Sequence, residues 1–271
     1  MRRIDHPDAM QAAARMLHRD GIRVGFVPTM GFLHEGHLSL MRLAREHCDH
    51  VVVSIYVNPL QFGPTEDLDQ YPRDLEGDAA QCESVGVNTL FVPTTLFDAG
   101  HSTRVSVDAL TQNLCGAARP GHFDGVTTVV ARLFGIVQPR VAVFGEKDFQ
   151  QLAVIRRMVR DLCMPIHVVG GPLVRDNDGL ALSSRNKYLD AAARTRALSL
   201  HRALHAIKDA ETPSVAERLQ LGRAILDADE VDYLAIVDPG SLQPLAVVDG
   251  PARALVAARI GTTRLIDNLG L

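Results

Sequence analysis

Strand-like and helix-like segments alternate over the first two thirds of the chain, and this alternation limits the fold more than any other feature. The expected strands are residues 22–28, 51–57, 89–92, 140–144 and 166–169. The expected helices between them are residues 34–48, 75–85, 126–137 and 149–162. Helices between successive strands are the connections that parallel strands require. The pattern therefore predicts an α/β fold with a doubly wound parallel sheet, whose ligands bind beyond the carboxyl ends of the strands.

The pattern changes at residues 174–190, a polar, glycine-containing segment that is typical of a loop or linker. Two helix-like stretches follow, at 191–209 and 214–228, and then three strand-like pieces, at 233–237, 255–260 and 263–266. We therefore expect a boundary near residue 175. It divides the chain into a larger domain, 1–175, and a small α+β domain, 176–271, with no site predicted after residue 190.

Composition excludes several classes of protein. Hydrophobic residues make up 46% of the chain, and 28 Lys and Arg against 32 Asp and Glu give a net charge of −4. High apolar content with a small net charge excludes global disorder, and the acidic balance disfavours a general nucleic-acid or anionic-membrane binder. No apolar run reaches the roughly 18 residues of a membrane-spanning helix.

The four cysteines are widely scattered and form no CxxC pair; they are Cys48, Cys82, Cys115 and Cys163. Such spacing favours reduced thiols over a disulfide framework or a zinc site. Cys48 and Cys163 fall in helical apolar patterns and are expected in the core. The amino-terminal MRRIDHPDAM lacks the apolar stretch of a secretory signal. We therefore expect a cytoplasmic protein.

The segment after the first strand is the first candidate for chemistry. It reads PTMGFLHEGH, and neither of the two common glycine-rich phosphate loops occurs in the chain. His34 and His37 are three residues apart at the start of the expected helix, so both rings can lie on one side of its first turn. Free N–H groups and the helix dipole attract anions there. The spacing predicts a phosphate site. Surface or core histidines are the simpler alternative, and a helical zinc pair would need HExxH.

Two further clusters follow expected strands. Asn58 and Gln61, in NPLQFG, supply neutral donors and acceptors for hydroxyl or carboxylate groups, although Asn-Pro also begins ordinary turns. Lys147, in FGEKDFQQ, can reach phosphates, and Gln151 lies one turn further on the same face. The alternative for this second cluster is a charged helix start with Asp148 as its N-cap.

Two loops carry cations that could act on an anion. In DGLALSSRN, two hydroxyls precede Arg185; the arrangement clamps an anion when it is ordered and is otherwise a flexible loop. In CGAARPGHFDG, Arg119 and His122 could belong to a gate over a pocket or to a plain surface loop. No cluster decides the function alone. Three of them, however, follow strands at the same edge of one predicted sheet.

Five motifs, in this order, resemble those of the pantoate–β-alanine ligase family. They are PTMGFLHEGH, VSIYVNPLQFGPTEDLDQYPRD, CGAARPGHFDGVTTVV, FGEKDFQQL and DGLALSSRN, and they span roughly residues 25–190. HEGH is similar to the HxGH signature of the wider nucleotidyltransferase and class I aminoacyl-tRNA synthetase superfamily, and SSRN is similar to its mobile KMSKS-type loop. Leu182 stands where many relatives carry Met, a conservative apolar change. The resemblance implies a Rossmann-like ATP- and pantoate-binding domain and a carboxyl-terminal lid domain.

The resemblance implies an ATP-dependent ligase that condenses (R)-pantoate with β-alanine to pantothenate, AMP and pyrophosphate, in coenzyme A biosynthesis. The intermediate would be an enzyme-bound pantoyl-adenylate, and Mg²⁺ would accompany ATP. A carboxylate that attacks the α-phosphorus becomes a mixed anhydride without any protein nucleophile, so the enzyme mainly orients two anions and neutralises charge. Because an acyl-adenylate hydrolyses readily, a lid that excludes water is expected.

The resemblance also implies a role for each motif residue. Catalysis would depend on His34, His37, Lys147 and Arg185, with His37 as proton donor to pyrophosphate because the unperturbed pKa of imidazole is about 6.5. ATP would bind to Met30, Gly31, Phe32, Leu33, His34, Glu35, Gly36, His37, Gly145, Glu146, Lys147, Asp148, Val174, Leu182, Ser183, Ser184 and Arg185. Pantoate would bind to Asn58, Gln61 and Gln151. Phosphate oxygens would hold Mg²⁺, and no protein ligand is assigned to it.

The resemblance further implies a homodimer with small-molecule substrates, and neither nucleic acid nor membrane as a partner. Three alternatives stay open. A nucleotidyltransferase of the same superfamily shares the HxGH element but would not need the pair Gln61 and Gln151. A tRNA-charging enzyme would need a basic RNA-binding appendage, which the chain does not show. A non-catalytic nucleotide-binding module would be favoured by loss of His37, Lys147 or Arg185, and all three are present.

Overall fold

The computed structural model describes residues 1–64 and 66–271 and divides into two compact units. The N-terminal unit comprises Met1–Asp108, Arg119–Glu146 and Gln151–Pro172. The C-terminal unit comprises Ala109–Ala118, Lys147–Gln150 and Leu173–Leu271. A single division at residue 175 differs from this, since it leaves two short segments of the C-terminal unit with the first domain. Thr65, in the second motif, lies outside the described residues.

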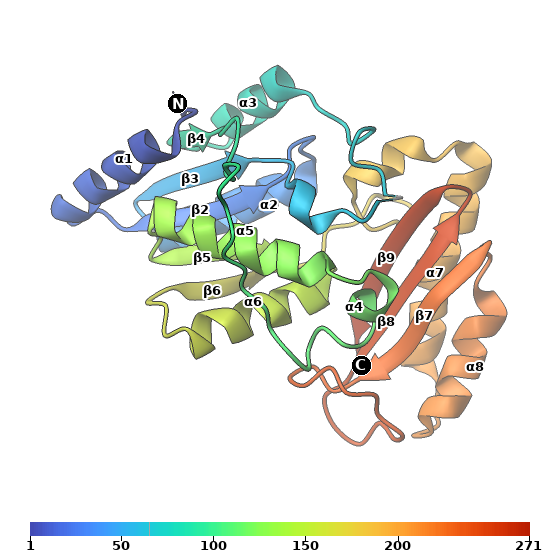
Figure 1. Ribbon diagram of the computed structural model, residues 1–271. Helices are drawn as coiled ribbons and strands as arrows, with labels where there is room; N and C mark the ends of the chain where they lie inside the picture. The colour runs from blue at the N-terminus through green and yellow to red at the C-terminus, as the bar shows by residue number, and fades with distance from the viewer. Residues whose placement is uncertain (65) are drawn as a thin grey trace. The chain divides into compact units, whose positions relative to one another are not determined.

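A six-stranded parallel sheet forms the centre of the N-terminal unit (Figure 1). Its strands are β1 (Arg2–Ile4), β2 (Val24–Thr29), β3 (His50–Ile55), β4 (Thr89–Phe91), β5 (Val141–Gly145) and β6 (His167–Gly171). Their order is β1-β4-β3-β2-β5-β6, and every pair is parallel. The predicted α/β fold with a doubly wound parallel sheet is confirmed.

Helices cover both faces of this sheet. They are α1 (Pro7–Arg19), α2 (Glu35–His47), α3 (Leu75–Ser84), α5 (His122–Val137) and α6 (Phe149–Asp161). A Cβ atom at Gly170 of β6 would meet Leu152 of α6, whereas one at the next residue, Gly171, would meet Leu40 of α2. Because successive strand residues point to opposite faces, α6 and α2 lie on opposite sides. Burial on both faces explains why β3 reads as a continuous run of branched apolar residues.

The chain reverses its direction across the sheet between β2 and β5. From β2 it proceeds through β3 to β4 on one side, and it then returns to place β5 and β6 on the other. The ladder between β2 and β5 contains only two residue pairs, Gly25–Val141 and Phe26–Ala142, so within the described chain the carboxyl ends of these strands are not paired. Such a reversal is where open parallel sheets bind ligands.

Pro28 suits this unpaired end of β2. The Thr29 carbonyl accepts a hydrogen bond from the Tyr56 N–H on the β3 side. Because backbone groups alternate along a strand, the Pro28 nitrogen faces β5 instead. Proline has no backbone N–H to donate to a neighbouring strand, so no hydrogen bond is lost at a position where the pairing with β5 has already ended.

A three-stranded antiparallel sheet, in the order β7-β8-β9, forms the C-terminal unit with two long helices (Figure 1). Its elements are α4 (Cys115–Ala118), η3 (Ser184–Tyr188), α7 (Ala191–Asp209), α8 (Val215–Ile225), β7 (Glu230–Val237), β8 (Arg253–Ile260) and β9 (Thr263–Gly270). Leu200, Leu204 and Ile207 of α7 are buried against apolar residues of the sheet such as Val256. The predicted small α+β domain is confirmed.

The sequence-based description is incomplete in one part and wrong in another. The expected elements begin at residue 22, whereas β1 and α1 precede them; β1 has only three residues, two of them arginines, and shows no alternation. Cys163 is exposed, not in the core, because α6 ends at Asp161 and Cys163 follows in a left-handed turn with φ of 50°. Cys48 is buried as expected. None of the helices within the described residues is long and apolar enough to cross a membrane.

Candidate active site

Three of the predicted clusters follow adjacent strands at the carboxyl edge of the parallel sheet. The loop with His34 follows β2, the short helix η1 (Pro59–Gln61) follows β3, and the turn η2 (Glu146–Asp148) follows β5. β2 lies between β3 and β5, so the strands that precede these clusters are neighbours. The sheet therefore brings the histidine loop next to the Gln61 segment and to the end of β5.

His34 and His37 lie together at the first turn of α2. His34 is the N-cap residue, and the centroids of the two rings are 4.0 Å apart. The His34 backbone N–H donates to Nδ1 of His37 at 3.3 Å. Nδ1 of His37 is thus an acceptor, which puts the proton of the neutral ring on Nε2. The pair stands beside the free N–H groups at a helix start, where an anion is favoured.

A buried carboxylate on α3 holds the loop that leads to these histidines. Asp78 is 2% exposed; its Oδ2 accepts from the Phe32 N–H at 2.8 Å and its Oδ1 from the Leu33 N–H at 2.7 Å. Gly31 and Phe32 both have positive φ, 84° and 51°, so the loop needs such support. Burial raises the pKa of Asp78, and the two N–H donors oppose that rise.

Asp78 is absent from the predicted site residues, because it lies on a helix, outside the segments after strands and outside the two cationic loops. The available signal is its place on α3, one turn before the buried Cys82, where an apolar residue would be expected.

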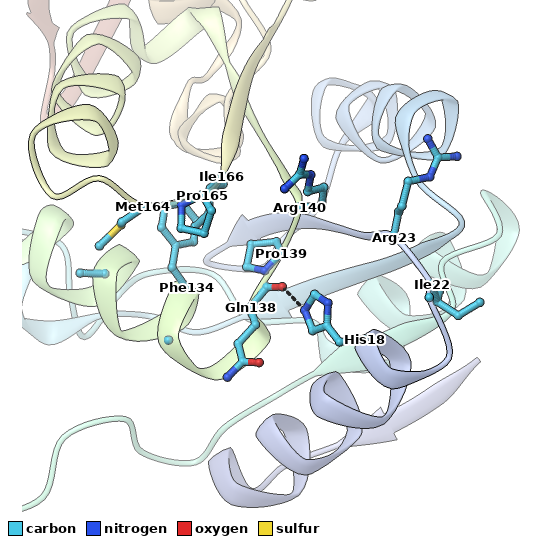
Figure 2. Close-up of a pocket in the computed structure, with 13 residues that line it drawn as sticks. His18, Ile22, Arg23, Phe134, Gln138, Pro139, Arg140, Met164, Pro165 and Ile166 are labelled. Atoms are coloured by element: carbon cyan, nitrogen blue, oxygen red, sulfur yellow. Dashed lines mark hydrogen bonds between the residues drawn. The ribbon is translucent and has the colours of Figure 1, made fainter.

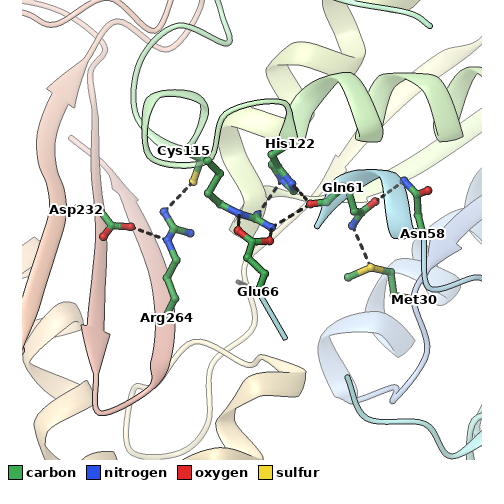
Figure 3. A network of polar contacts seen from close by, with 9 residues as sticks. Met30, Asn58, Gln61, Glu66, Cys115, His122, Asp232 and Arg264 are labelled. Carbon is green, nitrogen blue, oxygen red and sulfur yellow. Dashed lines mark hydrogen bonds and ion pairs between the residues drawn. The ribbon is translucent and has the colours of Figure 1, made fainter. Parts of the chain in front are cut away.

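Gln61 and Asn58, after β3, are joined to each other and to the histidine loop (Figure 3). Asn58 Nδ2 lies 3.1 Å from Gln61 Oε1, and Gln61 Nε2 lies 3.0 Å from the sulfur of Met30. Asn58 is buried and also donates to the Gly125 carbonyl at 3.1 Å. The structure therefore brings together three of the predicted ATP- or pantoate-binding side chains from the segments after β2 and β3.

Arg119 and His122 hold the backbone of Gln61 (Figure 3). Both donate to the Gln61 carbonyl, from Nη2 of Arg119 at 3.2 Å and from Nδ1 of His122 at 2.8 Å. Nε2 of His122 then accepts from Arg119 at 3.0 Å, which fixes the neutral Nδ1–H tautomer. These residues, which sequence analysis considered for a gate, support Gln61.

Arg119 is in turn paired with Glu66. Its Nε and Nη2 lie 2.6 and 2.5 Å from the two carboxylate oxygens, and both side chains are mostly buried. Burial alone would raise the pKa of Glu66, but the hydrogen bonds and charge of Arg119 outweigh it and lower that pKa.

The segment after β5 carries Gly145 and Glu146 in the N-terminal unit and Lys147 and Asp148 in the C-terminal unit. Lys147 Nζ lies 3.8 Å from Asp148 Oδ2. Of the two following glutamines, Gln150 is buried and donates to the Leu110 and Asn113 carbonyls, both at 2.8 Å. Gln151 is partly exposed, as a substrate-binding side chain must be.

A hairpin precedes the predicted cationic loop. The Asp176 N–H donates to the Leu180 carbonyl at 2.8 Å, and the Leu182 N–H donates to the Val174 carbonyl at 3.0 Å. Ser183 and Arg185 follow directly, and Ser183 Oγ accepts from the Arg185 N–H at 3.3 Å. Ser184 is buried, whereas Leu182 and Arg185 are partly exposed.

The described residues contain no group of three His, Cys, Asp or Glu side chains arranged to hold a metal ion.

A cavity of about 620 Å³ lies at the opposite edge of the parallel sheet (Figure 2). Its walls include Phe134, Pro139 and Met164, with Arg140 beside them. These residues surround the amino ends of β2, β5 and β6, away from the carboxyl ends where ligands of parallel sheets bind. The cavity is thus separate from the candidate active site, and no predicted site residue lines it.

The chain is similar in sequence to the proteins of one known family. A family model described as pantoate-beta-alanine ligase matches residues 2–270. The chain is 52% identical over 277 residues to pantothenate synthetase of Heliobacterium modesticaldum, covering 99% of each chain. It is 54% identical over 270 residues to pantothenate synthetase of Sphingopyxis alaskensis, covering 96% of each.

Solved structures of the same family are also similar to this chain. Pantothenate synthetase from Thermus thermophilus is 52% identical, with a TM-score of 0.93 and 99% of both chains covered. Pantoate-beta-alanine ligase from Francisella tularensis, complexed with beta-gamma ATP and beta-alanine, is 32% identical, with a TM-score of 0.83. The match covers 99% of this chain and 97% of the Francisella chain.

Proposed function

This chain belongs to the pantoate–β-alanine ligase family, and we propose that it performs the ligation through a pantoyl-adenylate. The reaction joins pantoate to β-alanine with the use of ATP. In the first step a pantoate carboxylate oxygen attacks the α-phosphorus, the bond to the β-phosphate bridging oxygen breaks, and pyrophosphate leaves. In the second step the free amine of β-alanine attacks the pantoyl carbonyl carbon, AMP leaves, and the amine loses a proton.

The position of the clusters after β2, β3 and β5 is the observation that carries this proposal. The chain reverses between β2 and β5, and the pairing of these strands ends early, so their carboxyl ends offer the usual binding place for a nucleotide. An adenylation needs two anions held in line and the charge on the phosphates balanced. A polar pair after β3 and a histidine pair after β2 supply groups for the two tasks.

We assign the nucleotide to the segments that follow β2 and β5 and to the hairpin loop. Residues 30–37 would bind ATP, with His34 and His37 on its phosphates. Nε2–H of His37 is a suitable proton donor to the departing pyrophosphate, since its Nδ1 is already engaged. Gly145, Glu146, Lys147 and Asp148 would line the nucleotide, and Val174 would contact adenine through its backbone.

Lys147 and Arg185 would supply cations to the phosphates in the transition state, and Leu182, Ser183 and Ser184 would accompany Arg185. Both cations belong to the C-terminal unit, whereas the histidines belong to the N-terminal unit. Mg²⁺ would enter bound to ATP and would add charge neutralisation at the phosphates.

We assign pantoate to Asn58, Gln61 and Gln151. Two of these are held in place independently of substrate, Gln61 by the bonds to its carbonyl and Asn58 by burial. Neutral amides orient hydroxyl and carboxylate groups without quenching the charge of the attacking oxygen, which suits a nucleophile.

We further propose a homodimer in the cytoplasm. The resemblance implies the dimer, and the four free cysteines fit a reducing compartment. Light scattering on the purified protein tests the first point, and a monomeric mass at micromolar concentration would contradict it.

ATP–pyrophosphate exchange with and without pantoate tests the adenylate. Exchange that requires pantoate but not β-alanine is the expected result, followed by AMP release when β-alanine is added. His37→Ala and Lys147→Ala should slow exchange by about 10²-fold or more, because each removes charge balance or a proton donor at the transition state.

His47→Ala, an exposed histidine in the last turn of the same helix, is the matched control and should exchange at the wild-type rate. Exchange that needs β-alanine would exclude a free adenylate step. Normal exchange in His37→Ala or Lys147→Ala would refute the assigned role of that residue.

A further inference from the structure

Two neighbouring polar residues near the carboxyl end of the chain are almost completely buried. Asp267 and Asn268, in strand β9, are each 4% exposed. Consecutive residues of a strand point to opposite faces of its sheet. One strand therefore presents a carboxylate on one face and an amide on the other, and buried polar groups of this kind need partners.

Asn268 is bonded to the segment that carries Lys147. Its Nδ2 donates to the Lys147 carbonyl at 2.9 Å. Two further contacts hold the same segment in the C-terminal unit. The guanidinium of Arg253 lies 4.2 Å from the centroid of the Phe149 ring, and Oε1 of Gln150 accepts from the Cys115 N–H at 2.9 Å. Of these three contacts, the hydrogen bond from Asn268 is the one made to Lys147 itself.

Asp267 is bonded to the hairpin that leads to Arg185. Its two carboxylate oxygens lie 2.7 and 2.8 Å from Nη1 and Nη2 of Arg175, a bidentate ion pair. Nη1 of Arg175 also donates to the Gly179 carbonyl at 3.0 Å, across the turn of the hairpin. Asp267 accepts in addition from the Asn268 N–H at 2.7 Å, so the two residues support each other.

We propose that Asp267 and Asn268 are positioning residues for adenylation, which tie the Lys147 segment and the Arg185 hairpin to one strand. β9 pairs with β8 along its whole length, so it is a firm base for both. The proposal rests on the proposed roles of Lys147 and Arg185. It assigns a function to a part of the chain where sequence analysis found no site.

The test is pantoate-dependent ATP–pyrophosphate exchange by Asn268→Ala. The variant keeps the Lys147 side chain but removes the donor that holds its backbone. We expect kcat for exchange to fall roughly 10- to 100-fold, because small displacements of a catalytic group are costly. The KM for pantoate should stay within about twofold, since pantoate is assigned to residues of the N-terminal unit. Asn268→Asp, which keeps the shape but replaces the donor by an acceptor, should show the same loss.

Ser199→Ala is the matched control. Ser199 is fully buried in α7 of the same unit, and its Oγ accepts from the Asp227 N–H at 3.0 Å. Like Asn268→Ala, the variant Ser199→Ala loses a buried hydrogen bond to the backbone. Because this bond is not made to Lys147, the variant should catalyse exchange at the wild-type rate. Thermal unfolding shows whether each variant is folded, and active-site titration gives the enzyme concentration by which its exchange rate is divided. The two measurements separate loss of folded enzyme from loss of rate.

A double-mutant cycle decides whether Asn268 acts through Lys147. If it does, Asn268→Ala should have little further effect on kcat in a Lys147→Ala background. An equal loss in both backgrounds, or a wild-type kcat in folded Asn268→Ala, would overturn the proposal. If Lys147→Ala itself exchanges normally, the proposed role of Lys147 fails instead, and the two failures are thus distinguished.

A second double-mutant cycle combines Asp267→Asn with Arg185→Ala. The isosteric amide keeps the space filled but gives Arg175 a neutral partner. We expect a lower kcat for exchange in the wild-type background and a non-additive loss with Arg185→Ala. Additive losses would show that Asp267 only stabilises the fold. Arg175→Lys keeps the positive charge but loses the bidentate geometry, so it should retain only part of the wild-type kcat.

Discussion

Single buried polar residues fix the loops on which the candidate active site depends. Asp78 is the clearest case, because its two oxygens serve two consecutive backbone N–H groups in a loop with left-handed residues. Burial raises the pKa of this carboxyl, and the two N–H donors oppose that rise. Because Asp78 holds the loop that is assigned to ATP, we expect this one side chain to affect both the free energy of unfolding and the affinity for ATP.

We predict that Asp78→Asn destabilises the protein and weakens ATP binding. The amide can accept only one of the two bonds and turns an NH₂ group toward the other N–H, a repulsion that leaves a buried donor unsatisfied. The cost is about 1–3 kcal/mol of unfolding free energy. Urea unfolding measures it, and the KM for ATP in the exchange assay should rise while that for pantoate changes little.

Glu76→Gln, an exposed acid on the same helix, is the control and should be neutral in both assays. An unchanged KM for ATP in folded Asp78→Asn would mean that the loop keeps its shape without the carboxylate.

At the scale of elements, the close approach of α5 to η1 sets the place of Gln61. A Cβ atom at Gly125 would lie 2.1 Å from the Leu60 carbonyl oxygen, so only glycine permits this approach. Gly135, further along the same helix, has no atom within 4 Å of its Cβ position. The helix thus contains a glycine that is required and a glycine that is not.

Gly125→Ala should therefore push η1 away and raise the KM for pantoate, with a loss of about 1–3 kcal/mol of unfolding free energy from overpacking. Gly135→Ala should stabilise the protein by up to about 1 kcal/mol, because alanine favours a helix interior. Thermal or urea unfolding and pantoate kinetics of the two variants give the comparison. Equal stabilities would contradict the contact between α5 and η1.

The Glu66–Arg119 pair joins the loop after η1 to the segment before α5 and makes stability depend on pH. The pKa of Glu66 is lowered in the folded protein, so the pair contributes its full stability above the unfolded pKa of a glutamate, about 4.3. That contribution is lost as the pH falls through the lower pKa of the folded state. We predict that Glu66→Gln is less stable than wild type at pH 7 and that this difference shrinks as the pH falls below about 4.3.

Urea unfolding between about pH 2.5 and pH 7 measures the difference directly, because the loss falls below the unfolded pKa of about 4.3. Asp69→Asn, in the same loop and outside this ion pair, controls for the general effect of removing a negative charge. A stability difference that stays constant with pH would show that the pair contributes by geometry alone.

Sequence patterns predict the elements well where periodicity is long, and poorly where it is short. Helix α7 matches its expected bounds, 191–209, because nineteen residues give more than five turns of pattern. The three residues of β1 give none. Motif residues can also be found from the sequence, since they follow strands or lie in glycine-containing loops, but Asp78 and the pair on β9 lie elsewhere in the fold. Their roles depend on contacts between segments far apart in sequence, which no local pattern contains.

At the scale of the whole molecule, the predicted ATP-binding residues are divided between two units. The histidine loop and Gly145 belong to the N-terminal unit, and Lys147 and the Arg185 loop belong to the C-terminal unit. Glu146 and Lys147 are adjacent in sequence but fall on different sides of this division. The residues that the resemblance implies for ATP therefore come from both units of the chain.

Hydrogen–deuterium exchange tests the assignment of ATP to residues in both units. We predict that a non-hydrolysable ATP analogue with Mg²⁺ and pantoate slows amide exchange in two segments at once, residues 30–37 and residues 182–186. Each loop has backbone N–H groups at a helix start, where an anion is favoured. In Lys147→Ala the protection of the second segment should weaken more than that of the first, because the histidine loop keeps its own contacts to the phosphates. Protection confined to residues 30–37 in the wild-type protein would contradict the assignment of residues 182–185 to ATP.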